Sequence, residues 1–297
     1  MYFPLMLVAK ATLLLAAAGV ATIVLWRASA ASRHLIWTLG LSGLLVLPLL
    51  SLVVPGWAVP LFPAAAESAA LTARWEDPVI RGPLATLDPQ PAAAPTPVPA
   101  TQASLPAISW TSGLLAVWML GVLLVLVRLA LGWWGVRRLA RRAQPVTSAE
   151  WTGLLRDLSW ILDVNVPVRL LQSDRATMPM TWGTRQPVIL LPADADAWPD
   201  ERRRVVLLHE LAHVARRDCL TQGFAGLACA LYWFHPGVWY AASRLRVERE
   251  RACDDRVLAA GTRAAEYAGH LLEVARHFRS VGLAGAAAVA MARPSQL

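Results

Sequence analysis

The stretch "VVLLHELAHVARRD", Val205–Asp218, decides the interpretation of the sequence around it. Its apolar residues have helical spacing, and residues four apart lie on one face of a helix. His209 and His213 can therefore present two imidazoles to one metal ion. Glu210, turned about 100° from His209 on the helix, can reach a water on that ion. The alternative is an ordinary amphipathic helix with two surface histidines.

The pattern H-E-x-x-H predicts a zinc (Zn2+) site with Glu210 as the general base. A catalytic site of this kind takes three protein ligands and keeps a fourth position open. The third ligand is predicted at Glu250, within the segment "RLRVERERACDD" of residues 244–255. Asp254, four residues later on the same helical face, is predicted to support the ligands without binding the ion.

Three further residues of this region offer donor atoms. Cys253 could bind as a soft thiolate, although a thiolate makes zinc less electrophilic, and His235 could supply another imidazole. Both remain open as third ligands. Glu248 lies on roughly the opposite face from Glu250 and is predicted to be solvated among arginines.

The segment between the motif and Glu250 predicts a helical hairpin. Residues 219–245 are apolar and look long enough for a membrane helix. A single crossing would place His213 and Glu250 on opposite sides of the bilayer, where they could not share an ion. Pro236 and the glycine after it can break the helix, so we expect a hairpin whose tip lies near residues 235–237.

Composition indicates a membrane protein. The chain has 297 residues, 56% of them hydrophobic, and a mean hydropathy of +0.45, whereas soluble domains are about half apolar. Three apolar runs have the length of a membrane span, about 20 residues: Leu5–Trp26, Leu35–Gly56 and Ser109–Trp134. The first run could also be a signal peptide, but its length and its flanking residues favour a retained helix.

Arginines predict the orientation of these runs. Arg27 and Arg33 lie in the first loop, and a cluster at residues 137–142 follows the third run. Short loops rich in arginine stay in the cytoplasm. We therefore expect a multi-pass protein of the bacterial inner (cytoplasmic) membrane, with its metal site facing the cytoplasm. Residues 1–56 then hold two transmembrane helices, 57–108 an extracytoplasmic Pro/Ala-rich loop, and 109–134 the third helix.

The net charge of +8, from 28 basic and 20 acidic residues, does not predict direct binding of nucleic acid. All basic residues except Lys10 are arginines, and they gather beside apolar runs. That placement predicts contact with an anionic lipid bilayer. The three cysteines form no CxxC pair and their number is odd, so no disulfide framework is expected.

Local signals predict the elements around the motif. Residues 147–150 fit a capping box at the start of a helix. The Val/Ile/Leu-rich segments 167–173 and 186–192 predict strands, with a turn at Gly183 between them. Asp200 is expected to cap the helix of the motif.

The expected fold class is a mainly α membrane protein with about three transmembrane helices. A cytoplasmic, zincin-like α+β metalloprotease domain with a membrane-dipping helical hairpin is expected at residues 135–280. Residues 281–297 are expected to form a C-terminal linker that is cut short.

Four pieces of the sequence together resemble the BlaR1/MecR1 family of membrane metallopeptidases, peptidase family M56: "MPMTWGTRQPVILLP", "LLHELAHVARRD", "WFHPGVW" and "RERACDD". Their order and spacing fit that family across residues 110–280. The resemblance implies zinc held by His209, His213 and Glu250, with Glu210 catalytic. It also implies a gluzincin-like site that abuts the membrane and faces the cytoplasm.

In the best-known members, an outer sensor domain binds β-lactams and the protease then triggers loss of a cytoplasmic repressor. This chain ends at "ARPSQL" without such a domain, and its only lysine, Lys10, lies in no S-x-x-K motif. A β-lactam sensor is therefore not expected in these residues. The resemblance further implies that an extended peptide substrate aligns beside a sheet edge near the metal, predicted at Pro187–Leu191.

Three functions fit this sequence. The first is a regulatory zinc endopeptidase that cleaves a cytoplasmic or membrane-bound protein, such as a winged-helix transcriptional repressor. The second is a non-proteolytic receptor or scaffold with a vestigial metal site. The third is a quality-control protease for misfolded membrane proteins, similar to the related M48 group. The intact set of His209, Glu210, His213 and Glu250 favours the first.

Overall fold

Within the part of the chain that the structure describes, three helices are long and apolar enough to cross a membrane. The computed structural model describes residues 2–53, 110–176, 178–265, 267 and 269. Helices form at all three predicted spans, and α4 continues through the arginine cluster. The predicted loop at 57–108 and linker at 281–297 lie outside the described residues. The three helices are α1 (Tyr2–Val24), α2 (Ala30–Val53) and α4 (Trp110–Arg142).

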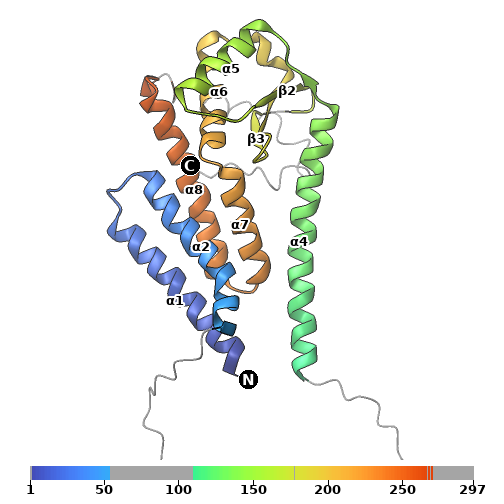
Figure 1. Ribbon diagram of the computed structural model, residues 1–297, viewed down its shortest axis with the longest axis vertical. Coiled ribbons are helices and arrows are strands. Elements are labelled where there is room, and N and C mark those ends of the chain that lie inside the picture. The colour runs from blue at the N-terminus through green and yellow to red at the C-terminus, as the bar shows by residue number, and fades with distance from the viewer. Residues whose placement is uncertain (1, 54–109, 177, 266, 268, 270–297) are drawn as a thin grey trace, which may run out of the picture.

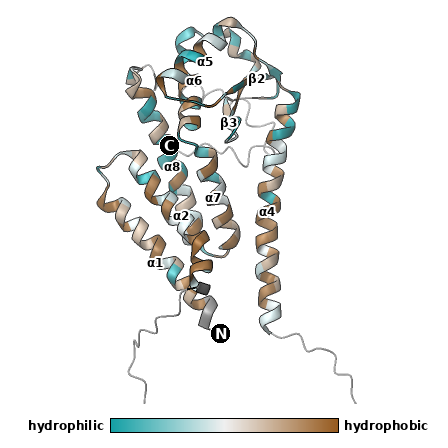
Figure 2. Cartoon of the chain, viewed as in Figure 1, coloured by the Kyte–Doolittle hydropathy of each residue, from teal (hydrophilic) through white to brown (hydrophobic). Residues whose placement is uncertain are grey.

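These helices alternate in direction, as three successive crossings require. In Figure 1 the N-terminus, the end of α2 and the start of α4 lie at one end of the molecule, and the strands lie at the other. Figure 2 shows apolar residues along α4, whereas hydrophilic residues gather around α5 and α6 near the strands. The end of the molecule that holds the sheet is therefore the more polar one.

A helical hairpin follows the H-E-x-x-H helix, as predicted. α7 (Asp218–Leu231) runs away from the strands, and α8 (Pro236–Ala259) returns toward them (Figure 1). Proline suits the first turn of α8, because the N–H that it lacks has no partner within a helix. The hairpin packs against α1, α2 and α4, so it lies beside the helices that can span a membrane.

The tip of the hairpin is held between α1 and α4. The Trp118 indole N–H donates to the carbonyl oxygen that ends α7 at 3.0 Å, and the Trp233 indole donates to Trp118 O at 3.2 Å. Gly121 permits this approach, because a Cβ there would lie 2.1 Å from the Trp233 ring. On the other side, His235 Nε2 lies 3.0 Å from the Thr12 hydroxyl.

A sheet of four strands forms within the described chain, in the order β1-β2-β4-β3. β2 and β4 are parallel and confirm the two predicted strands. The predicted turn at Gly183 joins β3 to β4, and its φ of +92° is a conformation that glycine adopts without strain. The strands are β1 (Gln144–Pro145), β2 (Arg169–Ser173), β3 (Met180–Trp182) and β4 (Val188–Pro192).

The segment predicted as the substrate edge is a central strand instead. β4 pairs with β2 on one side and with β3 on the other, and all of its residues are buried. The edge prediction for Pro187–Leu191 was therefore wrong. The reason is that β3 has three residues, too few for an alternating pattern to be recognised in the sequence. β3 lies at that edge of the sheet within the described residues.

Two predicted helix caps do not form. α5 (Ala149–Ile161) begins after Ser148, which makes no side-chain cap hydrogen bond, so the capping box is wrong. A short 3-10 helix (Ala193–Ala197) precedes α6 (Asp200–Ala215). Asp200 is the first residue of α6 and not its cap, although a negative charge there still complements the helix dipole.

α6 lies against the sheet and carries the motif. Leu207, Leu208 and Leu211 are fully buried and share a core with Ile189 and Leu191 of β4. Burial of each such side chain contributes about 1.5–3 kcal/mol. Because the leucines occupy one side of α6, the two histidines project from the other side, toward α8.

Candidate metal centre

His209 and His213 of α6 meet Glu250 of α8. The Nε2 atoms of both rings lie 3.7 Å from Glu250 Oε2, and the three ligand atoms all lie within 4.8 Å of one another. Donor atoms on a tetrahedral zinc ion are about 3.3 Å apart, given bonds of about 2.0–2.1 Å. The structure thus brings the three residues together at close to the spacing that one ion requires.

The hairpin accounts for this meeting. Arg217 has a φ of +55°, so the chain turns sharply between α6 and α7. After the tip, α8 returns past α6, and this return places Glu250 beside the motif. A single membrane crossing by residues 219–245 would have separated them.

Asp218 orients the His213 ring. Its Oδ2 lies 2.8 Å from His213 Nδ1. Burial would raise the pKa of Asp218, but the hydrogen bond with His213 and the nearby Arg216 guanidinium lower it. The carboxylate accepts the Nδ1–H of His213, which leaves the Nε2 lone pair for a metal. Asp218 was not predicted as a site residue, although an acidic residue five positions after His213 was a signal.

The other imidazole has a similar support. His209 Nδ1 lies 3.0 Å from the Tyr267 hydroxyl and 3.4 Å from Asp254 Oδ1. Tyr267 donates to Asp254 Oδ1 at 2.5 Å. Burial and this carboxylate raise the pKa of Tyr267 well above its usual range, so its oxygen accepts the Nδ1–H of His209. The structure brings Asp254 to the site and adds Tyr267, which nothing in its local sequence marks.

The site has an excess of negative charge. Burial alone would lower the pKa of His209, but hydrogen bonds with Asp254 and Glu250 raise it to about 10. Burial would raise the pKa of Glu250, but His209 and Arg249 hold it well below its usual range. A proton on His209 balances part of the negative charge of these carboxylates. A divalent cation at the Nε2 atoms would replace that proton and balance the same charge. Donor types and charge therefore both fit a metal ion.

Glu210 lies beside this group and contacts the sheet. It is 8% exposed, and its Oε2 accepts a hydrogen bond of 2.6 Å from the Thr181 hydroxyl of β3. Its charge acts on the neighbouring His209 ring. The carboxylate thus acts on one of the three ligand residues without belonging to the group of donor atoms.

Cys253 lies on the far side of the His213 ring. Its Sγ is 3.2 Å from His213 Nδ1 and 3.4 Å from Asp218 Oδ2. These three residues form a second group of donor atoms within 4.8 Å of one another. Burial raises the pKa of the Cys253 thiol well above its usual range, and a neutral thiol is a poor ligand. Because Asp218 already occupies Nδ1, the Nε2 side of His213 is the better metal site.

His235 and Glu248 make other contacts. His235 lies at the tip of the hairpin against α1, at the opposite end of α8 from α6. Glu248 is fully buried, so the prediction of a solvated carboxylate was wrong. Its oxygens accept hydrogen bonds from Arg33, Arg244 and Arg251, and the arginines that suggested a surface enclose it instead.

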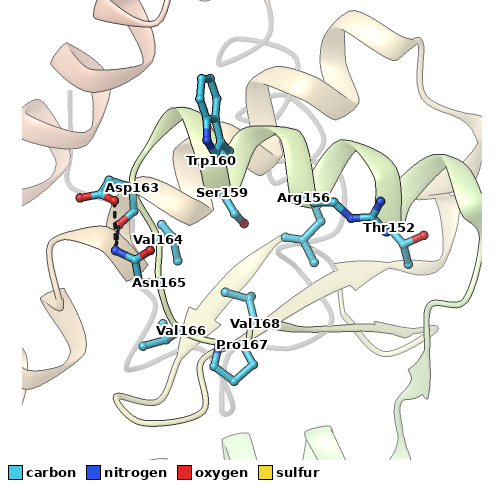
Figure 3. Close-up of a pocket in the computed structure, with 11 residues that line it drawn as sticks. Thr152, Arg156, Ser159, Trp160, Asp163, Val164, Asn165, Val166, Pro167 and Val168 are labelled. Carbon is cyan, nitrogen blue, oxygen red and sulfur yellow. Dashed lines mark hydrogen bonds between the residues drawn. The ribbon is translucent and has the colours of Figure 1, made fainter.

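A cavity of about 590 Å³ lies between α5 and the segment before β2 (Figure 3). Arg156, Ser159 and Val168 line it, and Asn165 donates to Asp163 Oδ1 at 3.0 Å at its wall. None of the three metal-binding candidates lines this cavity. It is therefore separate from the metal centre.

Two comparisons with known proteins found sequences similar to this chain. A family model described as BlaR1 peptidase M56 matches residues 3–297. The chain is also similar to the regulatory protein BlaR1 of Bacillus licheniformis, with 33% identity over 147 residues. The match covers 50% of this chain and 24% of that protein, so it spans about a quarter of the relative's length. The family match includes the helical bundle, the sheet and both helices that carry the metal centre.

Proposed function

The chain belongs to the BlaR1 peptidase M56 family, and we propose that it is a zinc endopeptidase of a bacterial cytoplasmic membrane that acts in signal transduction. The observation that carries this proposal is the meeting of His209, His213 and Glu250 at ligand spacing, with Glu210 next to His209 on α6. Two imidazole nitrogens and one carboxylate oxygen are a donor set that zinc accepts. Three protein ligands leave a fourth position for water or substrate.

Zinc held by these three residues would supply Lewis-acid activation of water and of a peptide carbonyl. Glu210 takes a proton from the attacking water and passes it to the nitrogen of the departing amine. Asp218 and the pair of Asp254 and Tyr267 keep both rings in the tautomer with Nε2 free.

β3 is the strand on which an extended peptide would align. It lies at the sheet edge within the described chain, and its middle residue contacts Glu210. A peptide that pairs with the backbone of β3 would pass the metal centre beside the general base. We therefore assign the substrate edge to β3 in place of the segment expected from the sequence.

A signal can reach the metal centre through α2 and α8. Arg33, near the start of α2, pairs with Glu248, two residues before Glu250. A movement of α2 would therefore act on the helix that carries a metal ligand. The relative is named a regulatory protein, which favours a regulatory substrate, such as a winged-helix repressor, over general protein turnover. The arginines around the sheet end favour the cytoplasm for that substrate.

The chain purified in detergent tests the proposal. The wild type should bind about one zinc ion per chain and hydrolyse fluorescein-labelled casein, used as a probe. Glu210→Gln should keep its zinc and lose about 10²–10⁴-fold in turnover, whereas His213→Ala should lose zinc as well. Equal hydrolysis by the wild type and Glu210→Gln would contradict the general base. A wild-type protein that transmits a signal in cells without any cleavage would favour the alternative of a non-proteolytic receptor.

A further inference from the structure

The hydroxyl of Thr181 forms a short hydrogen bond with Glu210. Its Oγ1 lies 2.6 Å from Oε2, and charge-assisted O–H···O⁻ bonds are about 2.5–2.7 Å long. A carboxylate can only accept, so the threonine donates. Glu210 is nearly buried, and this bond therefore gives its carboxylate a defined partner on the sheet.

Packing on both faces of the sheet fixes the position of Thr181. Thr181 pairs with Ile189 of β4. Ile189 is fully buried in the core that β4 shares with α6. Its neighbours Met180 and Trp182 pack against a separate core on the other face, which includes Leu190. Side chains alternate along a strand, so Thr181 is the residue of β3 that faces α6. Its β-branched side chain has few χ1 rotamers, and the hydroxyl is held in place.

We infer that Thr181 is a positioning residue for the general base. It holds Oε2 of Glu210 and leaves Oε1 to accept the proton of the attacking water. The inference rests on the proposed function. A free glutamate side chain rotates about three torsions, and a misplacement of about 1 Å can cost on the order of 10²-fold in rate. Thr181 lies on the edge strand. A peptide that pairs with β3 would therefore place its scissile bond at a fixed position relative to the carboxylate of Glu210.

Two substitutions separate the hydroxyl from the shape of the side chain. Thr181→Val keeps the branched shape and removes the donor, whereas Thr181→Ser keeps the donor and removes the methyl group. Thr152→Val is the matched control, because the Thr152 hydroxyl donates to the main-chain oxygen of Ser148, outside the metal centre. Zinc content, casein hydrolysis and calorimetric binding of acetohydroxamate to the zinc-loaded protein are measured for each.

Thr181→Val should keep its zinc and lose at least about tenfold in kcat, with KM within about twofold. Its affinity for acetohydroxamate, whose polar hydrogens a well-placed Glu210 accepts, should fall by about tenfold. Thr181→Ser should stay within about threefold of the wild type in kcat and in affinity for acetohydroxamate. Thr152→Val should have the same values as the wild type.

Two results would overturn the inference. One is a valine variant with the kcat and hydroxamate affinity of the wild type. The other is a serine variant that falls as far as the valine variant, which would assign the effect to packing. If the wild type fails to cleave casein, the peptidase proposal loses its support. The hydroxamate comparison still decides the role of Thr181 in that case.

Discussion

Arg33 forms an ion pair with the buried Glu248, with Nε and Oε2 2.9 Å apart. The same guanidinium donates to the carbonyl oxygens of Trp26 and Ala28 in the turn between α1 and α2. Glu248 lies on α8, two residues before Glu250. One side chain thus joins the N-terminal helices to the helix that supplies a metal ligand.

Arg33→Met should destabilise the protein by about 1.5–3 kcal/mol, because Glu248 loses the charged hydrogen bond from α2 but keeps those from Arg244 and Arg251. Thermal unfolding in detergent measures the effect. Arg251→Met is the matched control. Arg251 bonds the same carboxylate but is 54% exposed, so its loss should cost less than about 1 kcal/mol. Equal shifts for the two variants would show that α2 is not held by this pair.

Asp218→Asn should weaken zinc binding by about 10–100-fold while the fold is kept. The amide is nearly isosteric but removes the negative charge that holds the Nδ1–H of His213. Competition with a chelator measures the affinity. Asp255→Asn, at an exposed position of α8, should leave it unchanged. Zinc binding that is the same in both variants would exclude Asp218 as a support of the ligand.

The residues of the motif helix were predictable from the sequence, and of their partners on other elements only Glu250 and Asp254 were. His209, Glu210 and His213 follow from helical spacing alone. Glu250 required the additional inference that Pro236 breaks an apolar run into a hairpin. Tyr267 and Thr181 reach the motif from separate segments, and no local pattern marks either residue.

Burial was the property that local patterns predicted least well. Glu248 stands among arginines, which is typical of a solvated face, but its burial depends on Arg33, more than two hundred residues earlier. β3 was interpreted as part of a turn because three residues carry no periodicity. β4 then appeared to be an edge strand, although it is central.

Zinc affinity should rise by about tenfold per pH unit between about pH 7 and 9. The pKa of His209 is about 10, so the ring carries a proton across this range. A raised pKa favours the protonated ring, which competes with the metal, and the competition weakens as the pH rises. Calorimetry in two buffers of different ionisation enthalpy should show release of about one proton. An affinity that is constant between these pH values would contradict the assignment of His209 as a ligand.

Cysteine labelling tests the orientation. Cys219, the one exposed cysteine of the three, is first replaced by serine. A cysteine placed at exposed Gln144, directly after α4 and the arginine cluster, should react with an impermeant maleimide only after lysis. A cysteine at Thr86 should react in intact cells. The reverse pattern would place the metal centre outside the cytoplasm.

Gly121→Ala should displace the tip of the hairpin. The new Cβ would lie 2.1 Å from the Trp233 ring, and overpacking of this kind costs about 1–3 kcal/mol. Gly113→Ala, on the same helix, is the matched control, because a Cβ there has nothing within 4 Å. Alanine exceeds glycine in helix propensity by about 1 kcal/mol, so the control should be neutral or slightly stabilised in thermal unfolding.

Since α8 carries Glu250 back from the tip of the hairpin, Gly121→Ala should also bind zinc more weakly than Gly113→Ala. Identical unfolding and zinc affinity in the two variants would show that the contact between α4 and the hairpin does not set the position of α8.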